Sequence, residues 1–568
     1  MKKLLKCGLS MMCILAMLAG CGRQGGEVFT ESYNKEVTNS TADKEVLEGA
    51  TVITLSDSDI TVDGKPVTSD ESSAVYAAND IVFYLEGQGF TYGEGTEEDE
   101  HSQEEADAHT VVHITEPGTY AVNGKLSAGQ IAVDLGEEAE DDPEAVVTLI
   151  LNGVDIHCSV APAVIFYNVY ECGSSDAETA SKDVDTTAAG ANVLIADGTT
   201  NNINGSYVAR IYKSYELNEE GTEVVDNKKL HKYDAAFYSK MSMNVNGDTE
   251  GTGILNIQAE NEGLDSELHL TINGGNIYIT SGNDGINTNE DEVSVTTING
   301  GMLTIRVSGE TGEGDGIDSN GWLVINGGTV IAEACSFSGD AGIDSDMGIH
   351  INGGVVVATG NMLDRISEST QNYAVFSFAE SQKGGEAYTL KNDAEEIVFE
   401  YTPANSFIYL IVSNENLAAG TYTLWMGQTQ LAASEGNMPS GRGDMEFPEG
   451  FKLPEGMELP EGMESQEPGF GFGDAEAMDP GMMRPEGTDI DPGMMRPEGD
   501  MVMPEGFELP EGVEPPEGQD PGNFRGGMNG QGGRGNRDDF DMLGNAERST
   551  QITIVDGGNY FSNVAAAE

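Results

Sequence analysis

Four copies of a short acidic motif carry the side chains of this chain that could do chemistry. They read GLDSE at 263–267, GINTN at 285–289, GIDSN at 316–320 and GIDSD at 342–346. Between Met241 and Gly360 the sequence has eighteen Asp and Glu residues but a single Lys or Arg, which is Arg306. Like charges this close repel one another. A hard cation such as Ca²⁺ would relieve the repulsion by taking carboxylate, amide and carbonyl oxygens as ligands.

A second motif, INGG, follows each copy, at 272–275, 298–301, 325–328 and 351–354, so that its copies are 26, 27 and 26 residues apart. A fixed period of this size, built of strand-like segments, is typical of a solenoid. Each period contains three stretches that alternate between apolar and polar residues, with Asn-Gly or Gly-Gly at the corners. Glycine and asparagine accept the positive φ that sharp corners need. The sequence therefore predicts an all-β fold in which three strands make one coil and the coils stack as a parallel β-helix.

Alternation along the strands also predicts which side chains face outward. If Ile286 points into the core, Asn287 points out, and the same position in the other copies holds Asp265, Asp318 and Asp344. More acids lie just upstream of the motifs: Glu262, Asp284, Asp315 and Asp340. Because coils stack at about 4.8 Å, these side chains form columns of like charge. We expect bound Ca²⁺ along them; the alternative is a solvated acidic face in which Asp and Asn are ordinary turn residues.

One coil earlier, AAFYSK at 235–240 occupies the place of the acidic motif. It carries Tyr238 and Lys240 where the later copies carry acids, so we expect no metal at that level of the stack.

The chain opens with a secretion signal, MKKLLKCGLSMMCILAMLAGC, at 1–21. Its first residues are rich in lysine, its apolar run at 9–18 is too short to span a membrane, and LAGC at 18–21 resembles a bacterial lipobox. Cys21 would take lipid, and acyl chains hold a protein by burying methylene groups in the bilayer. We expect an exported protein anchored by lipid at the extracellular face of the cell membrane; the alternative is an uncleaved apolar anchor.

The overall charge limits the partners. A formal net charge of −71 on 568 residues disfavours nucleic acid and bare anionic lipid. A neutral polysaccharide remains open, and an acidic one requires a bridging cation. The cysteines Cys158, Cys172 and Cys335 are too few for a disulfide framework or a zinc site, and whether Cys158 and Cys172 pair is left open. We expect a monomer.

Composition divides the exported chain into five segments. Residues 22–49 are polar and weakly patterned, which suits a flexible spacer. Residues 50–380 alternate as strands of the β-helix, and 381–433 have the pattern of an antiparallel cap for its open end. In 434–548 the tripeptide PEG occurs eight times among Gly and Met, which predicts a disordered segment. Residues 549–568 alternate again around an Asp-Gly turn, so we expect a terminal hairpin that completes the cap.

The order of motifs resembles that of the pectate-lyase-like, carbohydrate-binding domain-containing proteins of clostridial surfaces. The motifs are TVDGKPV, HITEPGTYAVNGKLSAGQIAVDL, VTLILNGVDI, AAFYSK and the GIDS/INGG coils, over about 51–427 plus the terminal hairpin. The resemblance implies a right-handed parallel β-helix with calcium in its coils that binds plant cell-wall polysaccharide, notably acidic pectin chains. Transferred by position, it implies these metal ligands: Asp265, Asp284, Asn287, Asp315, Asp318, Asp340 and Asp344.

Three functions fit these features. A binder would hold successive uronate carboxylates on its calcium row and stack sugar rings on Tyr278 and Trp322, although packing also explains each aromatic residue. A calcium-dependent pectate lyase needs an Arg or Lys base, for which the coils offer only Arg306. Hydrolysis would need two carboxylates about 5–9.5 Å apart, which so many acids do not exclude. A structural surface protein would use calcium for stability alone. We expect a polysaccharide binder and not an enzyme.

Overall fold

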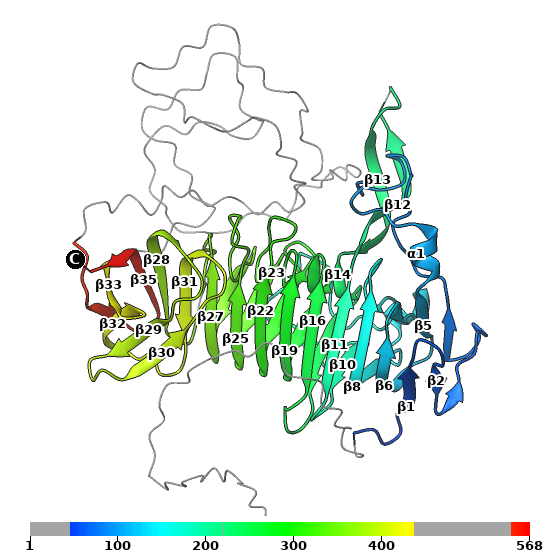
Figure 1. The fold of residues 1–568 in the computed structure, drawn as a ribbon, viewed down its shortest axis with the longest axis horizontal. Helices are drawn as coiled ribbons and strands as arrows, with labels where there is room; N and C mark the ends of the chain where they lie inside the picture. The colour runs from blue at the N-terminus through cyan, green and yellow to red at the C-terminus, as the bar shows by residue number, and fades with distance from the viewer. Residues whose placement is uncertain (1–45, 219, 368, 437–546, 568) are drawn as a thin grey trace, which may run out of the picture. The chain divides into compact units, whose positions relative to one another are not determined.

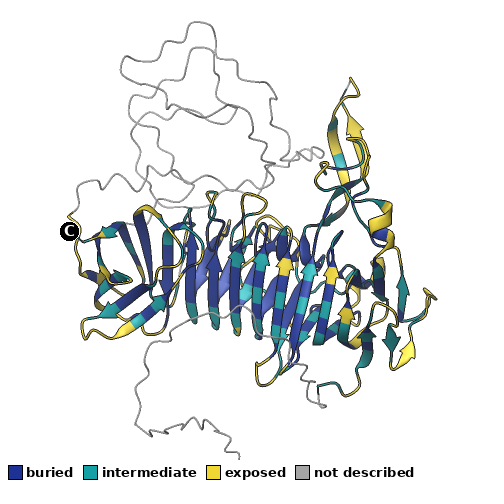
Figure 2. Cartoon of the chain, in the orientation of Figure 1, coloured by how far each residue is buried: buried dark blue, intermediate teal, exposed yellow. Residues whose placement is uncertain are grey.

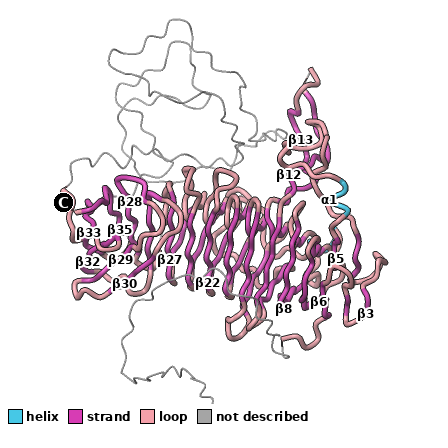
Figure 3. The backbone as a smooth tube through the Cα atoms, viewed as in Figure 1, coloured by secondary structure: helices cyan, strands magenta, loops and turns pink. Residues whose placement is uncertain are grey.

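Each period of the repeat supplies three strands, and strands in equivalent positions of successive periods pair in parallel. The computed structural model describes residues 46–218, 220–367, 369–436 and 547–567. In these residues the strands form a mixed 25-stranded sheet, an 8-stranded sheet and a 2-stranded arm (Figure 1). Among the described residues, helix is confined to α1 (Gln103–Asp107) and a 3-10 turn (Glu137–Asp141) (Figure 3). The all-β prediction is confirmed, while pairing is mixed: parallel in the repeats and largely antiparallel toward the two ends.

The 8-stranded sheet, here called the first ladder, carries the acidic motif. Only its outermost pair, β4 with β5, is antiparallel. In spatial order its strands are β4 (Val75–Ala78), β5 (Thr110–Ile114), β7 (Gly129–Val133), β9 (Val164–Phe166), β14 (Ala235–Ser239), β17 (Glu262–Ser266), β20 (Ile286–Thr288) and β23 (Ile317–Ser319).

Two further parallel ladders belong to the large sheet, and both begin on β6 (Gly118–Leu126) and the long β8 (Val147–Cys158). The second ladder continues through β10 (Ala191–Ile195), β15 (Met243–Gly247), β18 (Leu270–Ile272), β21 (Val295–Ile298), β24 (Trp322–Ile325) and β26 (Gly348–Ile351). The third ladder continues through β11 (Thr200–Gly205), β16 (Ile254–Ala259), β19 (Asn276–Ser281), β22 (Met302–Val307), β25 (Thr329–Glu333) and β27 (Val355–Gly360).

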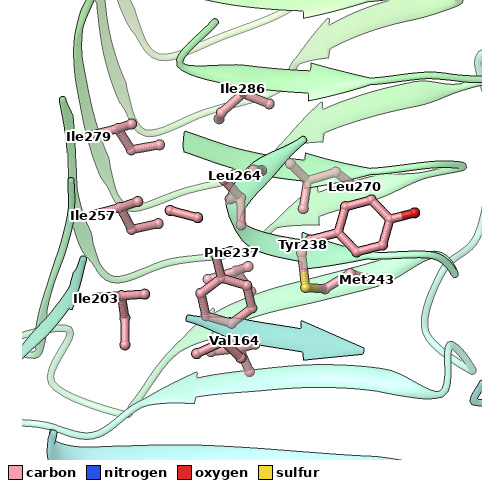
Figure 4. Packing of buried hydrophobic residues seen from close by; sticks show 14 of the residues in the cluster. Val164, Ile203, Phe237, Tyr238, Met243, Ile257, Leu264, Leu270, Ile279 and Ile286 are labelled. Atoms are coloured by element: carbon pink, nitrogen blue, oxygen red, sulfur yellow. The ribbon is translucent and has the colours of Figure 1, made fainter. Parts of the chain in front are cut away.

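The apolar residue of each alternating strand points into the space that the three ladders enclose. Phe237, Leu264 and Ile286 of the first ladder lie opposite Ile257 and Ile279 of the third ladder (Figure 4). All five side chains are at most 2% exposed. Burying one such side chain contributes roughly 1.5–3 kcal/mol, so each coil adds a similar increment to the stack.

The INGG motif forms the corner between the second and third ladders. Gly301 and Gly328 have φ of +84° and +79°, and a Cβ on either would lie 2.6 or 2.7 Å from a carbonyl oxygen of the preceding corner. Only glycine fits such a position. The asparagine side chains of the motif hydrogen-bond from coil to coil, as between Asn299 and Asn273 (2.9 Å) and between Asn326 and Asn299 (3.0 Å). Such amide ladders fix the spacing of the stack.

The C-terminal end of the third ladder is closed by antiparallel strands, with β31 pairing with both β27 and β28. The cap comprises β28 (Tyr373–Gln382), β29 (Tyr388–Asn392), β30 (Ile397–Tyr401), β31 (Phe407–Ser413), β32 (Gly420–Met426), β33 (Thr429–Glu435), β34 (Ile552–Ile554) and β35 (Gly558–Ala566). Its own aromatic core includes Phe376, Tyr388, Phe407 and Phe561. A covered edge cannot pair with another chain.

The cap departs from the sequence expectation in two ways. The boundary expected at residue 380 falls inside β28, which pairs with β31 and β35 of the cap instead of forming a last coil. The final residues do not form the expected hairpin, because β34 pairs with β32 whereas β35 pairs with β28 and β33. Both strands thus pair with cap strands that lie more than a hundred residues earlier in the sequence. An isolated two-stranded hairpin would be only marginally stable.

At the N-terminal end, β1 (Thr51–Leu55) pairs with β6 and with β2 (Thr61–Val62), which pairs with β3 (Lys65–Pro66). An arm of β12 (Val208–Leu217) and β13 (Val224–Tyr233) projects from the stack (Figure 1). The thiols of Cys158, Cys172 and Cys335 are free, so the possible Cys158–Cys172 bridge is not formed. No helix in the described residues is long and apolar enough to cross a membrane.

Candidate metal centre

Strand pairing brings the acidic motifs into one column on the first ladder. Asp265 of β17 is in register with Asn287 of β20, which is in register with Asp318 of β23. A bridge one residue earlier places Asp344 next in the column. On the preceding coil, Tyr238 of β14 holds the same position. Alternation in the sequence predicted this column and its end at the tyrosine.

The acids just upstream of the motifs form a second column, which the backbone holds in place. The amide of Asp315 donates to Oδ1 of Asp284 (2.6 Å), and the amide of Ala341 donates in the same way to Oδ1 of Asp315. In the last coil, the position equivalent to Asp284 and Asp315 is therefore held by Ala341 and not by an acid. Asp340 lies one residue earlier and accepts from the amide of Gly314 (2.7 Å). Each coil thus orients the carboxylate of its neighbour.

The acidic columns are more buried than the sequence suggested. Asp265 is 0% exposed and lies wholly inside the protein, and three further candidates are also buried: Asp284, Asn287 and Asp344. Intermediate exposure remains at Asp315, Asp318 and Asp340. Alternation predicted that Asp265, Asn287, Asp318 and Asp344 point away from the core, but three of these four are buried. Alternation within one strand cannot reveal whether other parts of the chain cover an outward-pointing side chain.

Three buried oxygens near the column have no hydrogen-bond partner among the described residues: Glu262 Oε2, Asp265 Oδ2 and Asn287 Oδ1. The other polar atom of each of these three side chains does form a hydrogen bond. Asn287 Nδ2 donates to Glu262 Oε1 (3.2 Å), and Asn289 Nδ2 donates to Asp265 Oδ1 (2.6 Å). A buried polar atom without a partner costs about 1–3 kcal/mol, and more if it is charged. Unpartnered oxygens beside engaged ones are what a hard cation would require of a site.

Burial changes the protonation of these carboxyl groups. Burial, with the charge of Asp234 second, raises the pKa of Glu262 to about 8. The pKa values of Asp265, Asp284 and Asp315 are raised well above the ordinary value, first by burial and then by neighbouring carboxylates. Without a cation Glu262 is therefore mostly protonated at neutral pH, and the shifts of the other three groups favour the protonated form in the same direction. Metal binding would therefore release protons and depend on pH.

A lysine from outside the repeats lies at one end of the columns. Lys232, near the end of β13, is 3.6 Å from Asp234 Oδ2, and its charge lowers the pKa of Glu262 and Asp265. A count of basic residues within the coils alone could not find this cation, because Lys232 precedes them in the sequence. Lys232 offsets part of the charge at the Asp265 end, whereas burial and other carboxylates dominate the pKa of Asp315 at the opposite end.

The tightest carboxylate group is at that opposite end. Asp315, Asp318 and Asp344 each place one carboxylate oxygen within 4.8 Å of the others. They come from two successive coils, and Asp284 and Asp340 also act on the pKa of Asp315. Three or more carboxylates from a rigid scaffold, with partial exposure for entry, form an oxygen-only donor set that suits Ca²⁺. The structure thus brings five of the seven candidates into one neighbourhood, and Asp265 and Asn287 extend the column toward Lys232.

The other candidate ligand-binding residues are not brought together. Tyr278 lies on β19 of the third ladder, whereas Trp322 begins β24 of the second ladder. The two rings therefore cannot form one stacking platform. Arg306 also lies on the third ladder, where its Nε is 3.8 Å from the buried Glu333, and is not on the ladder that carries the acidic motif.

A family model and a solved structure match this chain. The family model described as carbohydrate-binding domain-containing protein matches residues 108–398. A solved structure, that of the polysaccharide lyase-like protein from C. thermocellum in a gadolinium derivative, is 19% identical with a TM-score of 0.29, and the alignment covers 53% of this chain and 90% of that one. No curated protein matches.

Proposed function

Because this chain belongs to the family of carbohydrate-binding domain-containing proteins, we propose that it binds polysaccharide through a right-handed parallel β-helix that Ca²⁺ stabilises. The observation that carries the calcium proposal is the group of Asp315, Asp318 and Asp344, with carboxylate oxygens within 4.8 Å of one another. Unpartnered oxygens on Glu262 and Asp265 support the same proposal. The parallel register of the three ladders supports the β-helix.

Calcium in such a site supplies positive charge that removes the repulsion between stacked carboxylates. The residues of the chain do the rest. The backbone amides of Asp315 and Ala341 orient two carboxylates, and the stacked coils hold ligands from neighbouring levels at a fixed spacing. Because most of the acids are buried, we propose that the ion acts mainly on stability. Direct contact between calcium and a uronate carboxylate is restricted to the partly exposed end at Asp315 and Asp318.

The ligand is a plant cell-wall polysaccharide, for which the sequence suggested an acidic, pectin-like chain. The place of action is the extracellular face of the cell membrane, with Cys21 lipidated. Residues 1–45, which include the signal, the lipobox and most of the spacer, lie outside the described residues, as do the PEG-rich residues 437–546.

Binding is favoured over a lyase by the position of Arg306. A lyase needs its base next to the substrate carboxylate that calcium holds. Arg306 lies on a different ladder from the acidic motif and faces Glu333 across 3.8 Å, and Lys232, at the Asp265 end of the columns, is paired with Asp234 at 3.6 Å. The charge of Arg306 is directed to a buried structural carboxylate. The remaining alternative, a surface protein without a ligand, shares the calcium prediction and differs only in glycan retention.

One experiment separates the three functions. The exported chain would be applied to an array of acidic and uncharged plant polysaccharides, with Ca²⁺ and with chelator. Its melting temperature would be measured under the same two conditions. Release of unsaturated uronate would be followed in solution. Retained polysaccharide, a lower melting temperature after chelation and no uronate are expected. Sustained, chelator-sensitive uronate would establish a lyase. A calcium effect on melting without any retained glycan would leave only the structural function.

A further inference from the structure

The outward side of the third ladder changes from open to covered along the stack. Gln258 on β16 is exposed, Thr280 on β19 and Arg306 on β22 are intermediate, and Glu333 on β25 is 1% exposed. These four residues are in direct register. Figure 2 shows the same trend, with teal and yellow patches on strands toward β8 and mostly buried strands toward β27. The open part of this ladder is a sheet face that the cap does not reach.

Two columns of side chains make up this open face. One column runs through Asp155, Asn202, Asn256 and Tyr278, and the other runs through His157, Asn204, Gln258 and Thr280. Each is outward-facing, because the residues between them in sequence are buried, as Ile203 and Ile257 are. Strands β8, β11, β16 and β19 therefore present a surface rich in amides and hydroxyls, roughly 14 Å across at about 4.8 Å per strand. On β22 only Arg306 continues it, because Thr304 is 2% exposed.

The cap gives this face a definite end. Ile331 and Val357, which continue the Tyr278 column on β25 and β27, are at most 2% exposed and belong to the aromatic core of the cap. Glu333, which continues the Thr280 column, accepts hydrogen bonds from the amides of Ala404 (2.9 Å) and Asn405 (2.7 Å) of the cap. The open face is therefore a bounded surface and not the whole side of the stack.

Three polar side chains of this face have hydrogen-bonding groups that no other described residue uses. Asn256 Nδ2 donates to Asn202 Oδ1 (2.8 Å), but the side chains of Asn204, Gln258 and Thr280 make no hydrogen bond to another described residue. Each amide offers two donors and an acceptor, and the hydroxyl offers both functions. Groups that donate and accept at regular spacing match the hydroxyl groups of a sugar chain.

The charge of this face differs from that of the protein as a whole. Its charged groups are compensated, since Lys125 pairs with Asp155 (2.9 Å) and Arg306 lies beside Glu333 (3.8 Å). The rest of a chain with formal net charge −71 repels a polyanion. The geometry points to this amide-rich face as the polysaccharide-binding surface, with an uncharged polysaccharide chain as its ligand. This inference rests on the proposed function and names its surface and ligand class.

The matched range supports the choice of surface, because every strand from β8 to β27 lies within residues 108–398 of the family match. The surface is also distinct from the acidic columns, which lie on the first ladder. Chelation should therefore weaken binding only through its effect on folding.

The test is affinity electrophoresis of the exported chain in gels that contain xyloglucan, galactomannan or polygalacturonate. The variant Asn204→Ala/Gln258→Ala/Thr280→Ala removes three neighbouring groups from the face. The control Asn416→Ala/Thr421→Ala/Gln551→Ala removes the same three residue types from exposed positions of the cap. Each lost neutral hydrogen bond weakens binding roughly two- to tenfold, so the Kd of the triple face variant for the uncharged polymer should rise by about eightfold or more, and that of the control should not change.

Each other outcome identifies what failed. If the wild type is retarded by an uncharged polymer and the face variant is retarded equally, the surface is wrong while polysaccharide binding stands. If polygalacturonate alone retards the wild type, the ligand class is wrong. If no polymer retards the folded wild type, the proposed function itself fails. An unchanged melting temperature of the face variant would exclude misfolding as the cause of a loss.

Discussion

The backbone amide of Asp315 donates a 2.6 Å hydrogen bond to Oδ1 of Asp284, the equivalent residue one coil earlier. The carboxylate of Asp284 thus has two roles: it accepts a structural hydrogen bond, and it adds charge to the columns. An asparagine can keep the first role through its side-chain oxygen but not the second. The two roles can therefore be separated by mutation.

Replacing Asp284 tests this separation. Asp284→Asn should unfold in chelator at the same or higher denaturant concentration than the wild type, because it removes a carboxyl group whose ionisation is opposed by burial and by neighbouring acids, and should lose part of the stabilisation by Ca²⁺. Asp284→Ala should be about 1–3 kcal/mol less stable in chelator, because the amide of Asp315 loses its acceptor. Urea unfolding with and without Ca²⁺ measures both. A full calcium response in Asp284→Asn would exclude this residue from the metal site.

Restoring the missing acid at position 287 should have opposite effects with and without metal. Asn287→Asp places a carboxylate between Asp265 and Asp318 and removes the amide that donates to Glu262 Oε1 (3.2 Å). In chelator the melting temperature should fall, because like charges are added in a buried column. In excess Ca²⁺ the loss should be recovered, and calorimetric titration should show tighter binding. Asn416→Asp, at an exposed position of the cap, is the control.

The stability of the metal-free protein should fall as pH rises. The folded pKa of Glu262 is raised to about 8 from its ordinary 4.5, so its contribution to stability is complete below about 4.5 and is lost as pH rises through 8. The raised pKa values of Asp265, Asp284 and Asp315 act in the same direction. Melting scans in chelator from pH 5 to 9 should show a steady decrease. Excess Ca²⁺ should flatten or reverse that slope, and a flat profile in chelator would contradict the buried, proton-holding column.

The junction between stack and cap should depend on one buried carboxylate. Glu333 accepts hydrogen bonds from the hydroxyl of Tyr401 and from the amides of Ala404 and Asn405, and Arg306 lies 3.8 Å away. Glu333→Ala should cost about 3–5 kcal/mol, because these donors and Arg306 lose their partner. Tyr401→Phe should cost only about 1 kcal/mol.

Hydrogen exchange can distinguish local from global damage at this junction. In Glu333→Ala, faster exchange is expected first in β30 and β31, which carry and follow Tyr401. Glu380→Ala, at an exposed position of β28, should leave exchange unchanged and serves as the control. Equal acceleration across all three ladders would show that Glu333 supports the whole fold and not the junction.

The proposed lipid attachment at Cys21 predicts where the protein is found in the cell. Cys21→Ser should move it from the membrane fraction to the medium, because the proposed lipobox then lacks the thiol that takes the acyl chains. Labelling with a fatty-acid analogue should be lost in the same variant. Retention of Cys21→Ser in the membrane would favour the uncleaved apolar anchor.

The sequence by itself determined the repeat, the all-β class and the register of the acidic column. Alternation and the INGG corners are local properties, and a period of 26 or 27 residues leaves little freedom in how Asp265, Asn287 and Asp318 align. The same local pattern explains why Tyr238 ends the column.

Only the tertiary structure decided which of these acids are accessible, which cation accompanies them and which face stays open. Burial of Asp265, the approach of Lys232 and the covering of Glu333 by the cap all depend on residues far away in the chain. Strand periodicity specifies the side of a sheet on which a residue lies, but solvent exposure and pKa depend on what packs against that side. Those contacts are made between segments whose separation in sequence follows no period.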